Sequence, residues 1–155
     1  MADLKHAAGC DLCDGDGGRL LFRSEKWRVV AVTGDEAEAF TGFCRVIWNS
    51  HVRELTDLPP DEREQFMAAV YRVEKALRAS LSPHKMNLAS LGNLTPHLHW
   101  HVIPRFTDDI AFPKPIWAVT LASPAGLGKL SVTKSRHPNT DEDWEQAVTR
   151  ALKPD

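Results

Sequence analysis

The sequence predicts an α+β fold built around an antiparallel sheet, and the order of its segments carries this prediction. Short strand-like segments come first, one long amphipathic helix follows them, and two further strand-like segments come after the helix. The chain has 155 residues, of which 43% are hydrophobic. A chain of that length buries enough apolar surface to fold unaided. We therefore expect a single domain over residues 1–155.

Three strands are predicted in the first third of the chain, over Leu20–Arg23, Trp27–Val32 and Phe43–Trp48. Each segment is rich in bulky or β-branched apolar residues, and each is bounded by residues that favour turns. After the long helix, the same reasoning predicts strands over Lys85–Leu91 and His97–Ile103. These five segments are the predicted sheet.

The long helix is predicted over Pro60–Leu81. Its apolar residues recur at steps of three and four, which places them on one helix face. These residues are Phe66, Val70, Val73, Leu77 and Leu81. Proline is favoured in the first turn of a helix, and Pro83 ends this one. A short helix is predicted near Asp141–Leu152, with Thr140 as its N-cap.

Composition excludes several classes of function. The formal net charge is −2, which argues against nucleic-acid binding and against attachment to a membrane surface. No apolar run approaches the roughly 20 residues that cross a bilayer. The N-terminal residues lack the apolar segment of a signal peptide, so we expect a cytoplasmic protein. Three cysteines are too few for a disulfide framework.

Three of the seven histidines, His97, His99 and His101, alternate with apolar residues over seven positions. On a strand this alternation puts the three imidazoles on one face, about 6.5–7 Å apart. The apolar partners are expected to face the helix: Leu98, Trp100 and Val102. Imidazole serves as metal ligand, proton carrier or nucleophile near pH 7. The alternative is an exposed strand face that is merely rich in histidine.

At these residues the sequence resembles the histidine-triad (HIT) family of nucleotide hydrolases and transferases. The family pattern alternates three histidines with apolar residues, and His97–Ile103 satisfies it throughout, followed by Pro104 and Arg105. The resemblance covers residues 10–106, which leaves 107–155 as a C-terminal extension. It implies the HIT-like fold, a five-stranded antiparallel sheet with one main helix and a short C-terminal helix. It also implies a homodimer.

The resemblance implies a covalent mechanism. The middle histidine, His99, would attack the α-phosphorus of a nucleotide, and His101 would contact phosphate oxygens and help move the leaving-group proton. Neutral imidazole suits this role because it is both a good nucleophile and a good leaving group from phosphorus. The favoured substrates are dinucleoside polyphosphates such as diadenosine tetraphosphate, with nucleoside phosphoramidates second. No organic cofactor is implied.

The resemblance also implies substrate contacts. Asp35 would bind the ribose, and Asn87 and Arg105 the phosphates, with Asn93 beside them and His97 at the edge of the same site. The alternatives are ordinary turn residues for Asp35, Asn87 and Asn93, and a solvated charge for Arg105. Where several family members carry a fourth histidine, this chain has Phe43.

Cys10 and Cys13 are spaced as half of a zinc site. A redox pair or two unliganded thiols are the alternatives. One branch of the HIT superfamily adds two histidines to such a pair, which implies structural zinc on Cys10, Cys13, His51 and His97. If His97 binds metal, it cannot act as acid or base. Cys44 is expected to be a small core residue.

Two interpretations from other classes remain open at this stage. In one, His97, His99 and His101 hold a catalytic metal, as pairs of histidines separated by one residue do on strands in zinc hydrases and oxygenases. In the other, the protein is a nucleotide-binding regulator with little turnover. The C-terminal extension, with Trp117 and Trp144, would either cap the substrate pocket or pack on the sheet.

Overall fold

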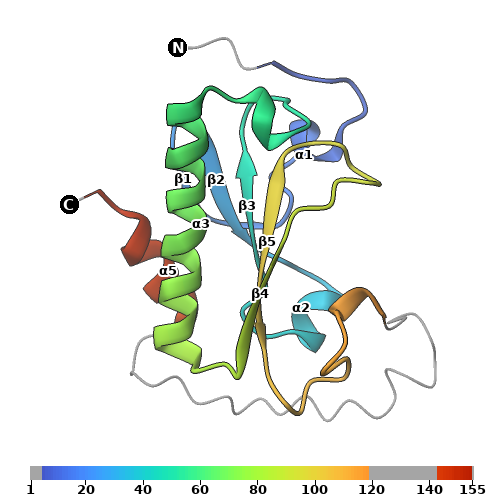
Figure 1. Cartoon of the computed structure of the whole chain (residues 1–155), viewed down its shortest axis with the longest axis vertical. Coiled ribbons are helices and arrows are strands. Elements are labelled where there is room, and N and C mark those ends of the chain that lie inside the picture. Colours follow the sequence, from blue (N-terminus) through green and yellow to red (C-terminus); the bar gives the residue numbers. More distant parts are fainter. Residues whose placement is uncertain (1–4, 119–142, 155) are drawn as a thin grey trace.

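The computed structural model describes residues 5–118 and 143–154 and has the predicted α+β architecture (Figure 1). Helices and strands follow one another in this order: α1 (Asp11–Asp14), β1 (Arg19–Arg23), β2 (Trp27–Ala31), α2 (Asp35–Ala39), β3 (Cys44–Trp48), α3 (Pro60–Leu81), β4 (Lys85–Ala89), β5 (His99–Arg105) and α5 (Trp144–Leu152). Two short 3-10 helices, Leu55–Asp57 and Ile116–Ala118, complete the described segments.

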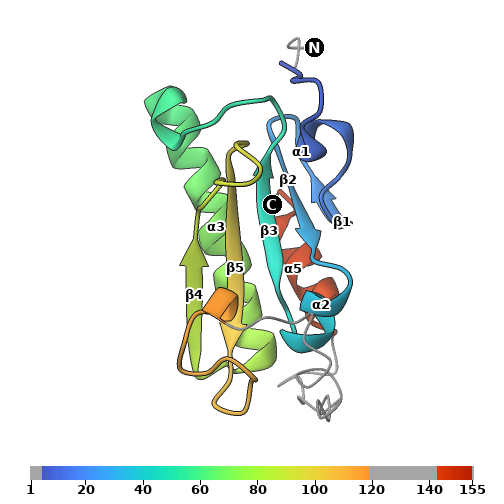
Figure 2. The same cartoon turned by 90° about the vertical axis from the view of Figure 1, so that its right-hand side faces the viewer.

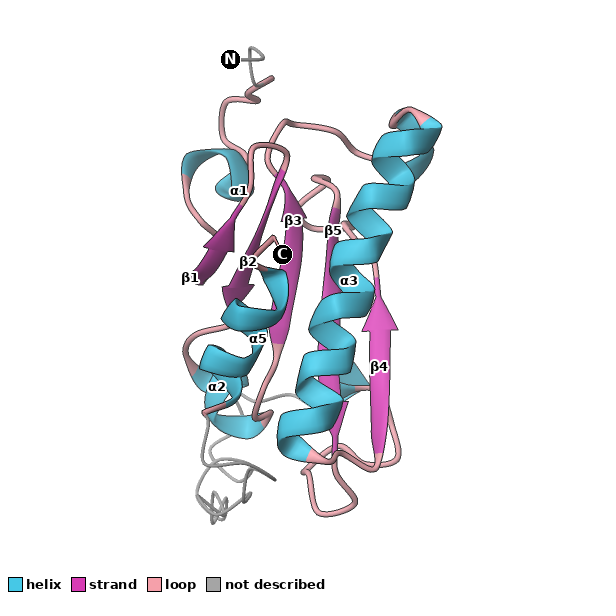
Figure 3. Ribbon diagram, turned by 90° about the vertical axis from the view of Figure 1, so that its left-hand side faces the viewer, coloured by secondary structure: helices cyan, strands magenta, loops and turns pink. Residues whose placement is uncertain are grey.

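The five strands form one antiparallel sheet in the order β1-β2-β3-β5-β4. Helices α3 and α5 cover one face of it (Figure 3), and α1 and α2 lie on the other side (Figure 2). The strand order places β5, which carries the histidines, between β3 and β4. This is the five-stranded HIT-like arrangement that the sequence predicts.

The main core lies between the sheet and α3, whose bounds are those predicted from its apolar spacing. The predicted stripe of that helix is buried, and Leu98 and Val102 pack against it from the sheet. Cys44 is fully buried in this core, as expected, and burial raises the pKa of its thiol. The core holds the helix face of β5 and leaves the other face for the imidazoles.

β5 begins two residues later than predicted and continues through Pro104. The backbone N–H of His97 donates to the carbonyl of Thr95, a turn that keeps His97 outside the strand. Pairing of β5 with β3 ends at Val102, and beyond it the strand pairs with β4 alone. Pro104 is tolerated there because, in the described part of the chain, β5 has no partner strand on its β3 side beyond Val102, so the missing N–H breaks no hydrogen bond of the sheet.

The C-terminal helix α5 is described from Trp144, with Asp143 at its N-cap position. The predicted cap at Thr140 and the predicted start at Asp141 lie outside the described residues. Among the residues that the structure describes, no helix combines the length and the apolar character needed to cross a membrane.

Candidate functional site

His99 and His101 form a buried pair on β5, each 7% exposed. Their ring centroids are 4.8 Å apart and the rings meet edge to face. Across the sheet, the Cα partner of His99 is Ile47 and that of His101 is Arg45, both on β3. The strand alternation therefore brings these two imidazoles together as the sequence predicts.

The hydrogen bonds of His99 fix its tautomer. Nδ1 lies 2.5 Å from the main-chain carbonyl oxygen of His97. Because a carbonyl oxygen can only accept, Nδ1 carries the hydrogen and Nε2 keeps its lone pair. Ser90 donates its hydroxyl to the main-chain carbonyl of His99 at 2.8 Å and steadies the strand there. The geometry leaves Nε2 as the ring nitrogen with a free lone pair.

Electrostatics keep the pair uncharged. Burial lowers the pKa of His99, and the nearby charge of Arg45 lowers it further, although the hydrogen bond to the His97 carbonyl acts in the opposite direction. Burial, followed by His99 and Arg45, lowers the pKa of His101 to about 3. Both imidazoles are therefore neutral near pH 7, the form in which imidazole attacks phosphorus.

His101 is enclosed by aromatic side chains. Its ring centroid lies 5.6 Å from that of Phe43 and 5.1 Å from that of Trp117. Its Nδ1 is buried and has no hydrogen-bond partner in the described part of the chain. Phe43 thus contributes an apolar wall beside His101.

Arg45 is a cation of the site that the sequence reasoning missed. One of its nitrogens donates to the carbonyl of Gly17 at 3.0 Å, and another lies 3.3 Å from the carboxylate of Glu36. Burial lowers the pKa of its guanidinium. The sequence offered one signal, the position of Arg45 two residues after Phe43. Once the pairing of the strands is known, this position places the Arg45 side chain on the face that carries the buried histidine pair.

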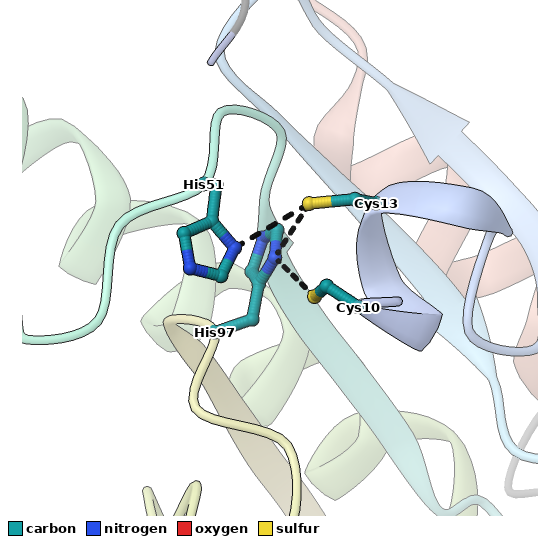
Figure 4. Close-up of side chains that lie close together, drawn as sticks. All are labelled: Cys10, Cys13, His51 and His97. Carbon is teal, nitrogen blue, oxygen red and sulfur yellow. Dashed lines mark hydrogen bonds between the residues drawn. The ribbon is translucent and has the colours of Figure 1, made fainter. Parts of the chain in front are cut away.

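His97 belongs to a second cluster, together with Cys10, Cys13 and His51 (Figure 4). Nδ1 of His97 lies 3.4 Å from the sulfur of Cys10 and 3.5 Å from that of Cys13, and Nδ1 of His51 lies 3.4 Å from the Cys13 sulfur. All four ligand atoms fall within 4.8 Å of one another. In the described ranges, this is the group of three or more potential ligands close enough to hold a metal ion.

The spacing of the four atoms fits a tetrahedral ion. Zinc bonds of about 2.3 Å to sulfur and 2.1 Å to nitrogen, at tetrahedral angles, put sulfur and nitrogen about 3.6 Å apart. Nε2 of His97 lies 2.6 Å from the carbonyl oxygen of Trp48, so Nε2 carries the hydrogen and Nδ1 is free to ligate. Burial lowers the pKa of His97 and so favours the neutral, ligating form.

The segment that carries the two cysteines is fastened to the sheet by Arg28, a buried residue of β2. Its guanidinium donates to the carbonyls of Leu12 at 2.6 Å, Asp16 at 3.0 Å and Gly15 at 3.2 Å. A further nitrogen donates to the side-chain oxygen of Asn49. Sequence reasoning missed Arg28 because its partners are main-chain carbonyls, which no motif records.

Arg105 requires a correction. It is neither a solvated charge nor available to a phosphate, because it is 2% exposed and its nitrogens are all engaged. It forms a two-bond ion pair with Asp109 at 2.8 and 2.9 Å, and it donates to Asn87 and to the carbonyl of Lys114, each at 2.8 Å. Arg105 thus links the segment after β5 to the sheet, and Asn87 takes part in this link by accepting one of its hydrogen bonds.

The remaining predicted substrate contacts, Asp35 and Asn93, have exposed side chains. Asp35 is at the first position of α2, and Asn93 is on the loop between β4 and β5. Within residues 5–118 and 143–154, no hydrogen bond or ion pair links either side chain to His99 or His101. His97 faces the cysteines, and its contribution to the pair is its main-chain carbonyl.

The HIT domain model matches residues 24–108, which is more than half of the chain. The chain belongs to the HIT domain family. Proteins of this family bind nucleotides and are typically hydrolases or transferases. The match begins after Cys13 and ends before Trp117, so these two residues lie outside the matched range. A comparison with curated proteins finds no match.

Solved HIT structures share the fold. A histidine triad protein from Bradyrhizobium japonicum superposes with a TM-score of 0.63 at 24% identity, covering 89% of this chain and 92% of that one. A histidine triad protein from Marinobacter aquaeolei gives 0.59 at 23% identity, covering 90% and 88%. A HIT-like protein from Bartonella henselae, described as involved in cell-cycle regulation and holding an unknown ligand, gives 0.57 at 15% identity, covering 95% and 99%.

Proposed function

We propose that this HIT protein cleaves dinucleoside polyphosphates at the α-phosphorus through a covalent nucleotidyl intermediate on His99. The observation that carries the proposal is the hydrogen bond from Nδ1 of His99 to the His97 carbonyl, which leaves Nε2 unprotonated. Burial keeps that imidazole neutral. A neutral nitrogen with a fixed direction is what attack on phosphorus requires.

Two displacement steps account for the reaction. In the first, Nε2 of His99 forms a bond to the α-phosphorus, and the bond from phosphorus to the bridging oxygen of the leaving polyphosphate breaks. In the second, a water oxygen bonds to phosphorus, the P–N bond breaks, and a nucleoside monophosphate leaves with His99 restored. The proton of that water passes to solvent or to the departing product. Positioning and charge stabilisation supply most of the catalysis in such transfers.

His101 and Arg45 supply the stabilisation in this proposal. Neutral His101 carries one N–H, which would donate to a phosphate oxygen in both steps. Arg45 lies close enough to lower the pKa of both imidazoles, so its field would also favour the negative charge that gathers on the phosphate. Asp35 and Asn93 stay proposed as outer substrate contacts because their side chains are exposed to a ligand.

We propose structural zinc at Cys10, Cys13, His51 and His97. The three sulfur–nitrogen distances of 3.4–3.5 Å support zinc over a redox pair, because a dithiol needs no imidazole on either sulfur. When bound, the ion would fix the chain just before β5. The orientation of His99 comes from the protein itself, because the main-chain carbonyl of His97 accepts a hydrogen bond from Nδ1 of His99.

Mass spectrometry tests the proposal directly. The protein is mixed with a panel of labelled dinucleoside polyphosphates and nucleoside phosphoramidates, quenched, digested and mapped. We expect a nucleotidyl group on His99 in the wild type and in His84→Asn, which changes an exposed histidine, and none in His99→Asn. A wild type with neither adduct nor product from any substrate overturns the proposal and leaves the nucleotide-binding regulator.

The same panel separates the other candidates. Product from phosphoramidates alone would replace the substrate class and keep the mechanism. Turnover that is lost in a chelator, restored by metal and never accompanied by an adduct would instead favour metal-dependent hydrolysis. The separation of His97 from the His99–His101 pair argues against that last mechanism.

A further inference from the structure

Trp117 places an accessible indole beside the reactive pair. It lies in the 3-10 helix Ile116–Ala118, beyond the HIT domain match, and is 43% exposed. Its ring meets His101 edge to face, at 69° and 5.1 Å between centroids. The exposed part of this indole leaves apolar surface in contact with water beside a buried polar pair.

The backbone around Trp117 is fixed in place. Ile116 is buried in a small core with Phe43 and Ile103 on the histidine side of the sheet. Arg105 reaches the carbonyl of Lys114 at 2.8 Å, and the Ala118 N–H donates to the Pro115 carbonyl at 3.0 Å. The backbone before Trp117 is therefore held by Arg105, which lies on the same strand as the histidines.

We propose that Trp117 stacks on the aromatic base of the nucleotide whose phosphate reaches His99. This inference rests on the proposed function. The ring centroids of His99 and His101 are 4.8 Å apart, and those of His101 and Trp117 are 5.1 Å apart. A phosphate at His99 thus puts a base, one ribose away, within reach of the indole.

Stacking is the interaction that this placement favours. Every nucleobase has a flat π-face, and an indole binds that face without reading its hydrogen-bonding edge. The exposed part of Trp117 would then be covered by the base, which removes apolar surface of both from water. The competing account makes Trp117 a plain cover over His101, with no contact to the base.

Two classes of ligand and three variants distinguish these accounts. Binding of the four nucleoside 5′-monophosphates and of ribose 5-phosphate is measured by calorimetry for the wild type, Trp117→Ala, Trp117→Phe and Trp144→Phe. Trp144 starts α5 on the other face of the sheet and is the matched control. Stacking predicts that Trp117→Ala weakens the tightest-binding nucleotide about tenfold and leaves ribose 5-phosphate binding unchanged. Trp117→Phe should keep most of the affinity.

The outcomes separate this inference from the proposed function. If Trp117→Ala weakens the nucleotides and ribose 5-phosphate equally, or weakens none of them, the stacking role is wrong while the nucleotide site stands. If the wild type binds none of the nucleotides and forms no adduct on His99, the proposed function fails and the stacking role fails with it. Circular dichroism and metal content of Trp117→Ala must match the wild type, since a loss of fold would weaken every ligand and not the base-bearing ones alone.

Discussion

His97 and Trp48 are joined by a hydrogen bond of 2.6 Å from the imidazole Nε2 to the main-chain carbonyl oxygen. This bond orients Nδ1 toward the sulfurs of Cys10 and Cys13, independently of a bound ion. A ring whose ligating nitrogen is oriented in advance loses less entropy on binding a metal. The purified protein should therefore carry close to one zinc ion per chain.

The four proposed ligands can be tested through metal content. Cys13→Ser and His51→Asn should each lose most of the bound zinc and unfold at lower temperature, because metal binding contributes to folding free energy. Cys44→Ser is the control, since this third cysteine is buried in the main core away from the cluster. Elemental analysis and thermal melts are the measurements. Stoichiometric zinc in Cys13→Ser would contradict the ligand set.

Arg28 should govern how tightly the metal is held without touching it. Arg28→Lys keeps the charge but cannot reach three carbonyls and Asn49 at once, so the cysteine segment should loosen. We expect zinc affinity to fall about 10- to 100-fold, measured by competition with a chromophoric chelator. Arg23→Lys is the control because Arg23 is a more exposed residue paired with Asp16. Equal affinity in both variants would show that Arg28 does not position the site.

His101 should make stability depend on pH. Its folded pKa of about 3 is below the unfolded value near 6.5, so the unfolded chain binds the extra proton first as the pH falls. The stability contributed by neutral His101 is complete above pH 6.5 and is lost on acidification. Between pH 8 and pH 5 the loss is about 2 kcal/mol.

Urea titrations of the wild type and His101→Gln measure this effect. The variant should lose less stability than the wild type between pH 8 and pH 5, since glutamine does not titrate. Direct observation of the imidazole by NMR gives a second measurement, in which the His101 ring stays neutral at pH 5. Identical pH dependence in both proteins would contradict the burial argument.

The ion pair of Arg105 and Asp109 should be costly to break from one side. Burial opposes the charge on Asp109, but the bonds from Arg105 and from the N–H groups of Phe106 and Ala111 hold the pKa of the carboxyl below its usual value. Asp109→Asn leaves a buried guanidinium without its charge partner, a loss of about 3–5 kcal/mol. Asp108→Asn, at an exposed neighbouring position, should cost far less. Denaturant unfolding measures both, and equal losses would contradict the prediction.

Local patterns were enough to predict the five strands and the long helix α3, but not the short helices α1 and α2, the second of which occupies a stretch expected to be a loop. The bounds of α3 follow from its apolar spacing and its flanking prolines, and the alternation around His99 identifies the strand that carries the pair. The four potential metal ligands could be assembled only through the family resemblance, because His51 and His97 are far apart in sequence. Once they were named, the structure placed their ligand atoms together.

Contacts that depend on how the strands pair could not be predicted from the sequence. Arg45 joins the site because β3 pairs with β5 at His101, and Arg28 because its strand passes under the cysteine segment. Arg105 lies close to the three histidines in the sequence, which suggested a phosphate contact. In the structure the chain turns after β5, and Asp109 becomes the partner of Arg105. A strand position gives the face on which a side chain lies, but not the partner that meets it there.

The ion pair between Arg105 and Asp109 also links the strand that carries His99 to the segment that leads to Trp117. His99 precedes this ion pair on β5, where it pairs with β3, and Trp117 follows it on the segment that Arg105 holds through the Lys114 carbonyl. The imidazole and the indole are thus carried by a single uninterrupted stretch of chain. Trp117 and His99 should therefore lose their order together on unfolding, because Arg105 fastens the segment before Trp117 to the strand that carries His99.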